Sequence, residues 1–179
     1  MNCSLNPHCE WNAPVDMFLD DELLTNTYSK WLFGPDNSGN IFNWTNEYIS
    51  FIAQEFGKYH LITADGSVYC QDNPLEQERI TFPLLRKQVD LSLPLLRDNG
   101  TLIMKMYTWF REDTQTLLYH LFDSFAEVHV AKPSCSRPGN SEVYLLCAGY
   151  RLNGQLIEIN NRYTTYRTID FSPRLPERL

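Results

Sequence analysis

Three ionisable side chains stand near the ends of apolar, strand-like runs of the sequence. Asp65 follows the run HLITA, Lys105 lies within GTLIMKMY, and Glu142 precedes VYLLC. Successive β-α units of roughly forty residues would bring such positions to one edge of an open α/β sheet, where strand ends converge and ligands bind. An acid, a lysine and a second acid gathered there shift one another's pKa values and can do acid–base chemistry. The alternative is three ordinary charges at strand ends with no shared site.

The elements that must position these side chains follow from the spacing of apolar residues. Helical spacing predicts a helix over 46–56, and a short apolar run predicts a buried strand over 59–64. Residues 75–96 are typical of a long helix, but Pro83 and Pro94 interrupt it. An interior proline costs about 3 kcal/mol in a helix, so we expect a kink or two separate pieces.

The second half of the sequence predicts the rest of the sheet. We expect a strand over 101–107 and a helix over 114–125, with Asp113 as the N-terminal cap of that helix. The strands expected over 127–131 and 142–149 have no helical pattern between them, which predicts an antiparallel hairpin with a long loop. The fold class is therefore α/β, a parallel sheet closed by an antiparallel C-terminal hairpin.

Length and composition restrict the kinds of protein that fit this sequence. Its 179 residues suit one domain, which we place at 1–150, followed by a C-terminal extension at 151–179. A hydrophobic fraction of 43% is that of a globular protein, and the net charge of −7 confines any nucleic-acid site to a local basic patch. No apolar run reaches the roughly 18 residues that a membrane span needs, and the first residues lack the pattern of a signal peptide.

Cysteine, histidine and glycine patterns exclude further classes. The five cysteines form no CxxC pair, which argues against a zinc site and a disulfide framework and favours a reduced, intracellular protein. The four histidines show no metal-ligand spacing, so we expect no metal. No GxGxxG turn is present, which argues against a dinucleotide-dependent oxidoreductase.

Several motifs resemble those of one enzyme family. LITADGS, QDNPLEQE, GTLIMKMY and AKPSCSRPGNSEVYLLCAGY occur in the order and spacing of the FtsJ-like RNA 2′-O-ribose methyltransferases, in particular the cap-specific mRNA enzymes. The upstream segment SLNPHCEWN…WLFGPDNSGNI is most similar to the cap 2 class, which methylates the second transcribed nucleotide. The resemblance covers residues 3–150. It implies a Rossmann-like methyltransferase fold, S-adenosyl-L-methionine as methyl donor, capped mRNA as substrate, and a location in the nucleus, the cytoplasm or both.

The resemblance also assigns roles to the ionisable side chains. The family uses a lysine–aspartate–lysine–glutamate tetrad, and Asp65, Lys105 and Glu142 stand at its last three places. By this resemblance Lys105 is the general base for the ribose 2′-hydroxyl, Asp65 organises donor and ribose, and Glu142 orients Lys105. A lysine can take this proton only if burial or a neighbouring cation lowers its pKa. The alternative for Lys105 is a strand-end lysine whose stem is buried and whose ammonium reaches solvent.

Binding residues are implied in the same way. Asn40, in the phrase SGNI, takes the place of a family aspartate that binds the donor's adenosine, so Asn40 and Asp65 are the expected cofactor-binding residues. Lys132 and Arg137 lie in the loop that faces capped RNA in the family and are the expected RNA-binding residues, unless they are ordinary solvated loop charges. The aromatic residues of the segment YTWF, at 107–110, either stack on bases or the cap or pack under the next helix.

Two features of the family are missing from the sequence. No glycine-rich turn of the kind that cradles the donor's methionine part precedes Asp36, and no lysine precedes Lys30 at the place of the first tetrad member. We therefore expect the first, central strand of the family's sheet to be absent and the chain to be N-terminally incomplete. The alternative function is a catalytically inactive fragment or pseudoenzyme that retains an RNA- or protein-binding surface.

Overall fold

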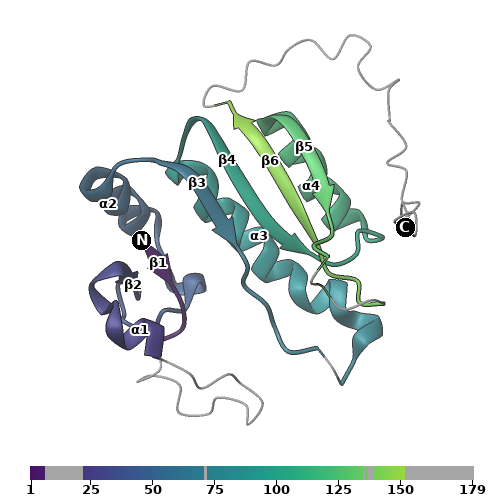
Figure 1. Cartoon of the computed structure of the whole chain (residues 1–179), viewed down its shortest axis with the longest axis horizontal. Helices are drawn as coiled ribbons and strands as arrows, with labels where there is room; N and C mark the ends of the chain where they lie inside the picture. Colours follow the sequence, from purple (N-terminus) through teal and green to yellow (C-terminus); the bar gives the residue numbers. More distant parts are fainter. Residues whose placement is uncertain (7–21, 71, 135, 137–138, 152–179) are drawn as a thin grey trace, which may run out of the picture.

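Four strands form the main sheet of the structure, a computed structural model that describes residues 1–6, 22–70, 72–134, 136 and 139–151. In spatial order they are β3 (Tyr59–Ala64), β4 (Leu96–Met106), β6 (Val143–Tyr150) and β5 (Phe125–Ala131) (Figure 1). β3 and β4 pair in parallel, whereas β6 runs antiparallel to both of its neighbours. Among the described residues, β3 therefore lies at one edge of the sheet and β5 at the other.

The expected α/β class and its antiparallel closure are confirmed. Along the chain, α2 (Asn46–Phe56), β3, α3 (Gln77–Leu95), β4 and α4 (Glu112–Ser124) alternate as predicted. β5 and β6 then form the predicted hairpin, and β6 enters the sheet between β4 and β5. The strand ends that carry the candidate residues thus come from neighbouring strands.

One face of the sheet packs on α3 and α4, and this packing decides where the residues of β4 point (Figure 1). Every second side chain from Leu102 to Met106 is fully buried, in one cluster with Leu85 of α3 and Leu117 of α4. Since successive side chains of a strand point to opposite faces, Lys105 lies on the face away from these two helices. Burial of each large apolar side chain contributes about 1.5–3 kcal/mol, so this orientation of β4 is strongly favoured.

Two helix predictions need correction. α3 runs unbroken through Pro83 and Pro94, so of the two expected outcomes the two separate pieces are wrong, and a kink stays a prediction. Both prolines are exposed, and the buried face of α3 packs on the sheet, which outweighs the cost of about 3 kcal/mol for an interior proline. α4 begins earlier than predicted, so Arg111 takes the N-cap position and Asp113 lies in the first turn, where an acidic residue suits the helix dipole.

The N-terminal segment forms a second, two-stranded sheet. β1 (Asn2–Cys3) pairs in parallel with β2 (Trp31–Leu32), and α1 (Glu22–Asn26) precedes β2 in the sequence. Gly39 packs so closely on β1's exit that an added Cβ would lie 1.9 Å from the Ser4 carbonyl oxygen, and its φ of 73° also favours glycine. Three short 3-10 helices complete the described elements: η2 (Tyr28–Lys30), η3 (Ile41–Asn43) and η4 (Pro74–Glu76).

The described structure ends at Arg151. The expected extension at 151–179 therefore lies, apart from this residue, outside the described residues. Within the described part of the chain, no helix is long and apolar enough to cross a membrane. The same residues contain no group of three or more His, Cys, Asp and Glu side chains that could hold a metal ion.

Candidate active site

An ion pair joins the carboxyl ends of β3 and β4. The Lys105 ammonium lies 2.8 Å from Oδ1 of Asp65, the residue that follows β3. The Lys105 side chain is 12% exposed, whereas that of Asp65 is 63% exposed. The sheet thus holds the lysine stem, while the carboxylate stays open to a ligand from solvent. The structure brings these two candidate residues together; their catalytic role stays a prediction.

Tyr144 belongs to the same site, and the sequence analysis did not identify it. Its hydroxyl donates a hydrogen bond to Oδ1 of Asp65 at 3.2 Å. In the sheet register Tyr144 lies directly opposite Lys105, and directly opposed residues share a face. Burial, and after it the charge of Asp65, raises the pKa of the Tyr144 hydroxyl, which therefore stays a donor at neutral pH. Strand alternation could have identified Tyr144 from the sequence. Tyr144 lies two residues after Glu142, and residues two apart in a strand point to the same face.

The charge of Lys105 results from two opposing effects. Partial burial lowers the pKa of its ammonium, but the hydrogen bond and the charge of Asp65 outweigh burial, and the pKa lies above its ordinary value. In this arrangement Lys105 is a cation at neutral pH. It can stabilise negative charge that develops on an oxygen, but it takes up a proton only where a further cation weakens the effect of Asp65.

Glu142 lies at the same end of the sheet without pairing with Lys105. It directly precedes β6, and none of the ion pairs among the described residues joins it to the Lys105 ammonium. Its charge adds to the raised pKa values of Tyr107 and Tyr144, which burial raises most. The expected direct orientation of Lys105 by Glu142 is therefore not seen, because Asp65 makes that contact.

Lys132 is bound to its own loop. Its ammonium donates to the carbonyl oxygens of Asn140 and Glu142, at 2.9 and 2.8 Å, and to Oδ1 of Asn140 at 2.6 Å. An ammonium has three protons to donate, so these contacts occupy all of them. In this position Lys132 stabilises the loop that leads to Glu142. It can attract an RNA through its positive charge, but its ammonium protons are already donated within the loop. Arg137, the other expected RNA-binding residue, lies outside the described residues.

A cleft of about 1520 Å³ opens beside Asp65. β1, Asn40, β3 and α3 all contribute to its walls. Oδ1 of Asn40 accepts a hydrogen bond from the Phe42 amide at 3.1 Å and so caps η3, which leaves the Asn40 amide nitrogen for a ligand. Three buried polar atoms without a partner belong to residues that line this cleft: Trp44 Nε1, Tyr59 Oη and Gln88 Nε2. These atoms lie beneath the surface of the cleft, so the polar groups that a ligand can reach are the Asp65 carboxylate and the Asn40 amide nitrogen.

Comparisons with known proteins identify relatives over most of the chain. A family model described as FtsJ-like methyltransferase matches residues 16–150. The chain is 43% identical over 152 residues to the cap-specific mRNA (nucleoside-2′-O-)-methyltransferase 2 of Mus musculus, and 39% identical over 150 residues to the Drosophila melanogaster protein of that name. The matches cover 83% and 82% of the chain but 19% and 21% of those relatives, so the chain spans about a fifth of their length.

A solved structure of a ribosomal RNA methyltransferase from Plasmodium falciparum is also similar. It is 27% identical, with a TM-score of 0.49, over 67% of this chain and 63% of that one. The family assignment rests on the family model and on the relatives matched by sequence. They confirm the resemblance that the motifs indicated, and the chain belongs to the FtsJ-like methyltransferase family.

Proposed function

We propose that the protein transfers a methyl group from S-adenosylmethionine to a ribose 2′-hydroxyl of capped mRNA, at the cap 2 position. The contact between Lys105 and Asp65 beside a large cleft carries the proposal, because it joins two of the tetrad residues expected from the family. The relatives are named cap-specific mRNA (nucleoside-2′-O-)-methyltransferase 2, which supports capped mRNA as substrate. We assign this activity to a domain at 1–150, treat 151–179 as an extension, and expect the protein in the nucleus, the cytoplasm or both.

The residues around the cleft fit the methyl donor. Asp65 and Asn40 line the same cleft, so one ligand can reach both. An exposed carboxylate favours a cationic ligand, and the amide nitrogen of Asn40 favours one with nitrogen or oxygen acceptors. S-adenosylmethionine has both properties and, when bound, supplies an electrophilic methyl group on a sulfonium.

Lys105 is the residue that we assign to the ribose hydroxyl. As a cation it stabilises the negative charge that develops on the hydroxyl oxygen as the proton passes to solvent, which is electrostatic assistance in a partly buried place. Asp65 fixes the position of the ammonium, and Tyr144 in turn donates to Asp65. Where a further cation lowers its pKa, Lys105 is neutral and takes the hydroxyl proton itself, so that it serves as the general base. The shared geometry of these three side chains matters because positioning alone supplies a large part of such rate enhancements.

The test is methyl transfer from labelled donor to capped RNA by the full-length gene product, with RNA binding measured in parallel. Lys105→Ala should lower turnover by about 10²- to 10⁴-fold and leave RNA affinity largely unchanged, because the lysine assists only as the hydroxyl loses its proton. Lys58→Ala is the matched control, since Lys58 is exposed and precedes β3 at the end away from Asp65. Near wild-type turnover in Lys105→Ala would refute the assignment.

A further inference from the structure

The acidic residues of the motif QDNPLEQE have no part in the site described so far, although Pro74 and Gln77 line its cleft. Its last glutamate, Glu78, lies in the first turn of α3 and is only 7% exposed, which is unusual for a carboxylate. Burial of a carboxylate is costly unless several donors bind it. The donors that bind Glu78 therefore indicate what this side chain does.

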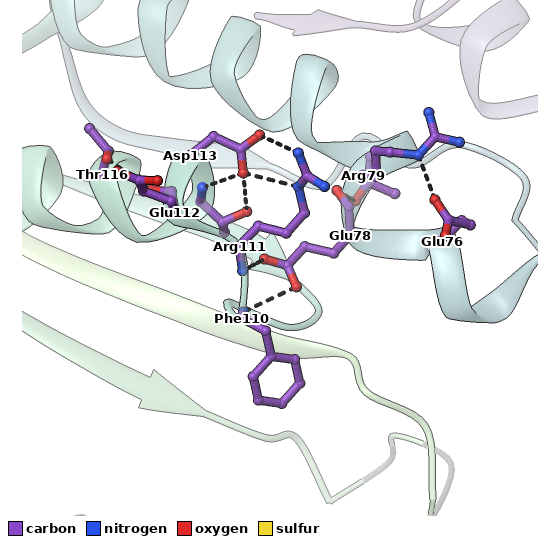
Figure 2. A network of polar contacts seen from close by, with 10 residues as sticks. Glu76, Glu78, Arg79, Phe110, Arg111, Glu112, Asp113 and Thr116 are labelled. Atoms are coloured by element: carbon purple, nitrogen blue, oxygen red, sulfur yellow. Dashed lines mark hydrogen bonds and ion pairs between the residues drawn. The ribbon is translucent and has the colours of Figure 1, made fainter.

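Glu78 binds the loop that joins β4 to α4 (Figure 2). Its Oε2 accepts hydrogen bonds from the Thr108 hydroxyl at 2.8 Å and the Phe110 amide at 3.1 Å, and its Oε1 accepts from the Arg111 amide at 2.8 Å. Burial alone raises the pKa of the Glu78 carboxyl, but these bonds, led by that of the Arg111 amide, together with the Thr114 side chain outweigh burial, and the pKa lies below its ordinary value. Glu78 is thus an ionised acceptor at neutral pH.

The bound loop begins directly beyond the Lys105 end of β4. Of its aromatic side chains, Tyr107 and Trp109 are half-buried, while Phe110 is 83% exposed. Figure 2 shows the Phe110 amide directed toward Glu78 and the Phe110 ring directed away from it. Phe110 therefore does not pack under the next helix. The Glu78 carboxylate fixes the backbone of Phe110, and the ring of Phe110 is exposed to solvent.

The residue before Glu78 binds the other loop of the site. Oε1 of Gln77 accepts a hydrogen bond from the Ser141 hydroxyl at 2.9 Å, next to Glu142. Gln77 and Glu78 are consecutive in the first turn of α3. One helix turn therefore contacts both loops that flank the pair of Lys105 and Asp65.

We propose that Glu78 is a positioning residue for the RNA, holding the 107–111 loop so that Phe110 stacks on a base of the substrate. This inference rests on the proposed function, because it names the part of the site that the RNA contacts. Aromatic rings suit this task since every base has a face on which to stack. A loop already held in its bound position also binds without the entropy cost of ordering it.

Glu78→Gln tests whether the carboxylate holds the loop. One side of a glutamine amide is a donor, so the amide oxygen can accept from the Phe110 amide or from the Arg111 amide but not from both. Hydrogen exchange of at least one of the Phe110 and Arg111 amides should be faster by about tenfold or more, the size expected for loss of a bond to a charged group. Glu76→Gln is the matched control, since Glu76 is an exposed carboxylate of the same motif. Unchanged exchange in Glu78→Gln would overturn the positioning role.

A milder variant covers the case in which Glu78→Gln does not fold. Thr108→Val keeps the shape of the side chain and removes only the hydroxyl that donates to Glu78. It should accelerate exchange of the Phe110 and Arg111 amides in the same direction but to a smaller extent. Equal exchange in Thr108→Val and the unmodified protein would count against a loop held by Glu78.

Binding of a short capped RNA tests whether the held loop serves the substrate. Glu78→Gln and Phe110→Ala should each weaken binding by about tenfold, and the double variant should be no weaker than either single variant, because both remove one stacked contact. KM for RNA should rise by a similar factor as the RNA affinity falls, while kcat changes little. Additive losses would overturn the coupling. If the unmodified protein binds no RNA, the proposed function and the stacking fail together, while amide exchange still decides whether Glu78 holds the loop.

Discussion

Asp65 receives both of its partners, the Lys105 ammonium and the Tyr144 hydroxyl, through Oδ1. A single carboxylate therefore sets the position and the charge of the lysine, because its negative charge raises the pKa of Lys105 against the effect of burial. At the scale of residues, the main interaction of the site is therefore that of the Asp65 carboxylate with the Lys105 ammonium. A second positive charge at Asp65 would weaken that control and move Lys105 from an electrostatic role toward that of a base.

This relationship predicts the titration of Lys105. In the unmodified protein the ammonium should lose its proton above pH 10.5, the ordinary value. Asp65→Asn removes the carboxylate and leaves burial as the main effect, so the pKa of Lys105 should fall. NMR titration of lysines labelled at Cε measures both values, with Glu127→Gln, an exposed carboxylate beside His129, as control. A Lys105 pKa that stays the same or rises in Asp65→Asn would contradict this account.

Among the elements, α3 contains an interior proline, Pro83. The packing of the helix on the sheet outweighs the loss of helix stability that this proline causes. Pro83 is exposed inside the helix and cannot donate a hydrogen bond to the residue four positions earlier. Pro83→Ala restores that bond without loss of buried surface, so the free energy of unfolding should rise by about 1–2 kcal/mol after allowance for a more flexible unfolded chain. Pro35→Ala, at an exposed turn proline, should bring no such gain. Urea unfolding of both variants measures the difference, and a less stable Pro83→Ala would show that the helix depends on its proline.

Local patterns explain which elements could be predicted from the sequence. α2 and β3 have the predicted limits, and the hairpin follows from the lack of a helical pattern in its loop, because periodicity and turn signals are local. The continuity of α3 depends on packing against the sheet, which cannot be predicted from local helix propensities. Tyr144 and Glu78 escaped prediction for a similar reason. The first acts through the register of β6 with β4, the second through contacts with a loop thirty positions further along the chain.

At the scale of the whole molecule, the two sheets line one cleft. β1 and β3 both contribute to its walls, and among the described residues each has a strand neighbour on one side only. Leu61 of β3 is 53% exposed at this cleft. An unpaired strand edge with exposed apolar side chains is a template for pairing with another strand. The surface beside the candidate site is thus also a surface prone to association.

The 179-residue chain by itself should therefore self-associate through the outer edge of β3. Leu61→Lys should reduce this association, because a charged side chain at a strand edge opposes the addition of another strand. Leu75→Lys is the matched control, since Leu75 is 97% exposed but lies in η4, away from any strand edge. Size-exclusion chromatography with light scattering, over a range of concentrations, should show a smaller average mass for Leu61→Lys and little change for Leu75→Lys. Equal effects of the two substitutions would point to general hydrophobic association, and an unmodified chain that stays monomeric throughout would show that the edge of β3 is protected.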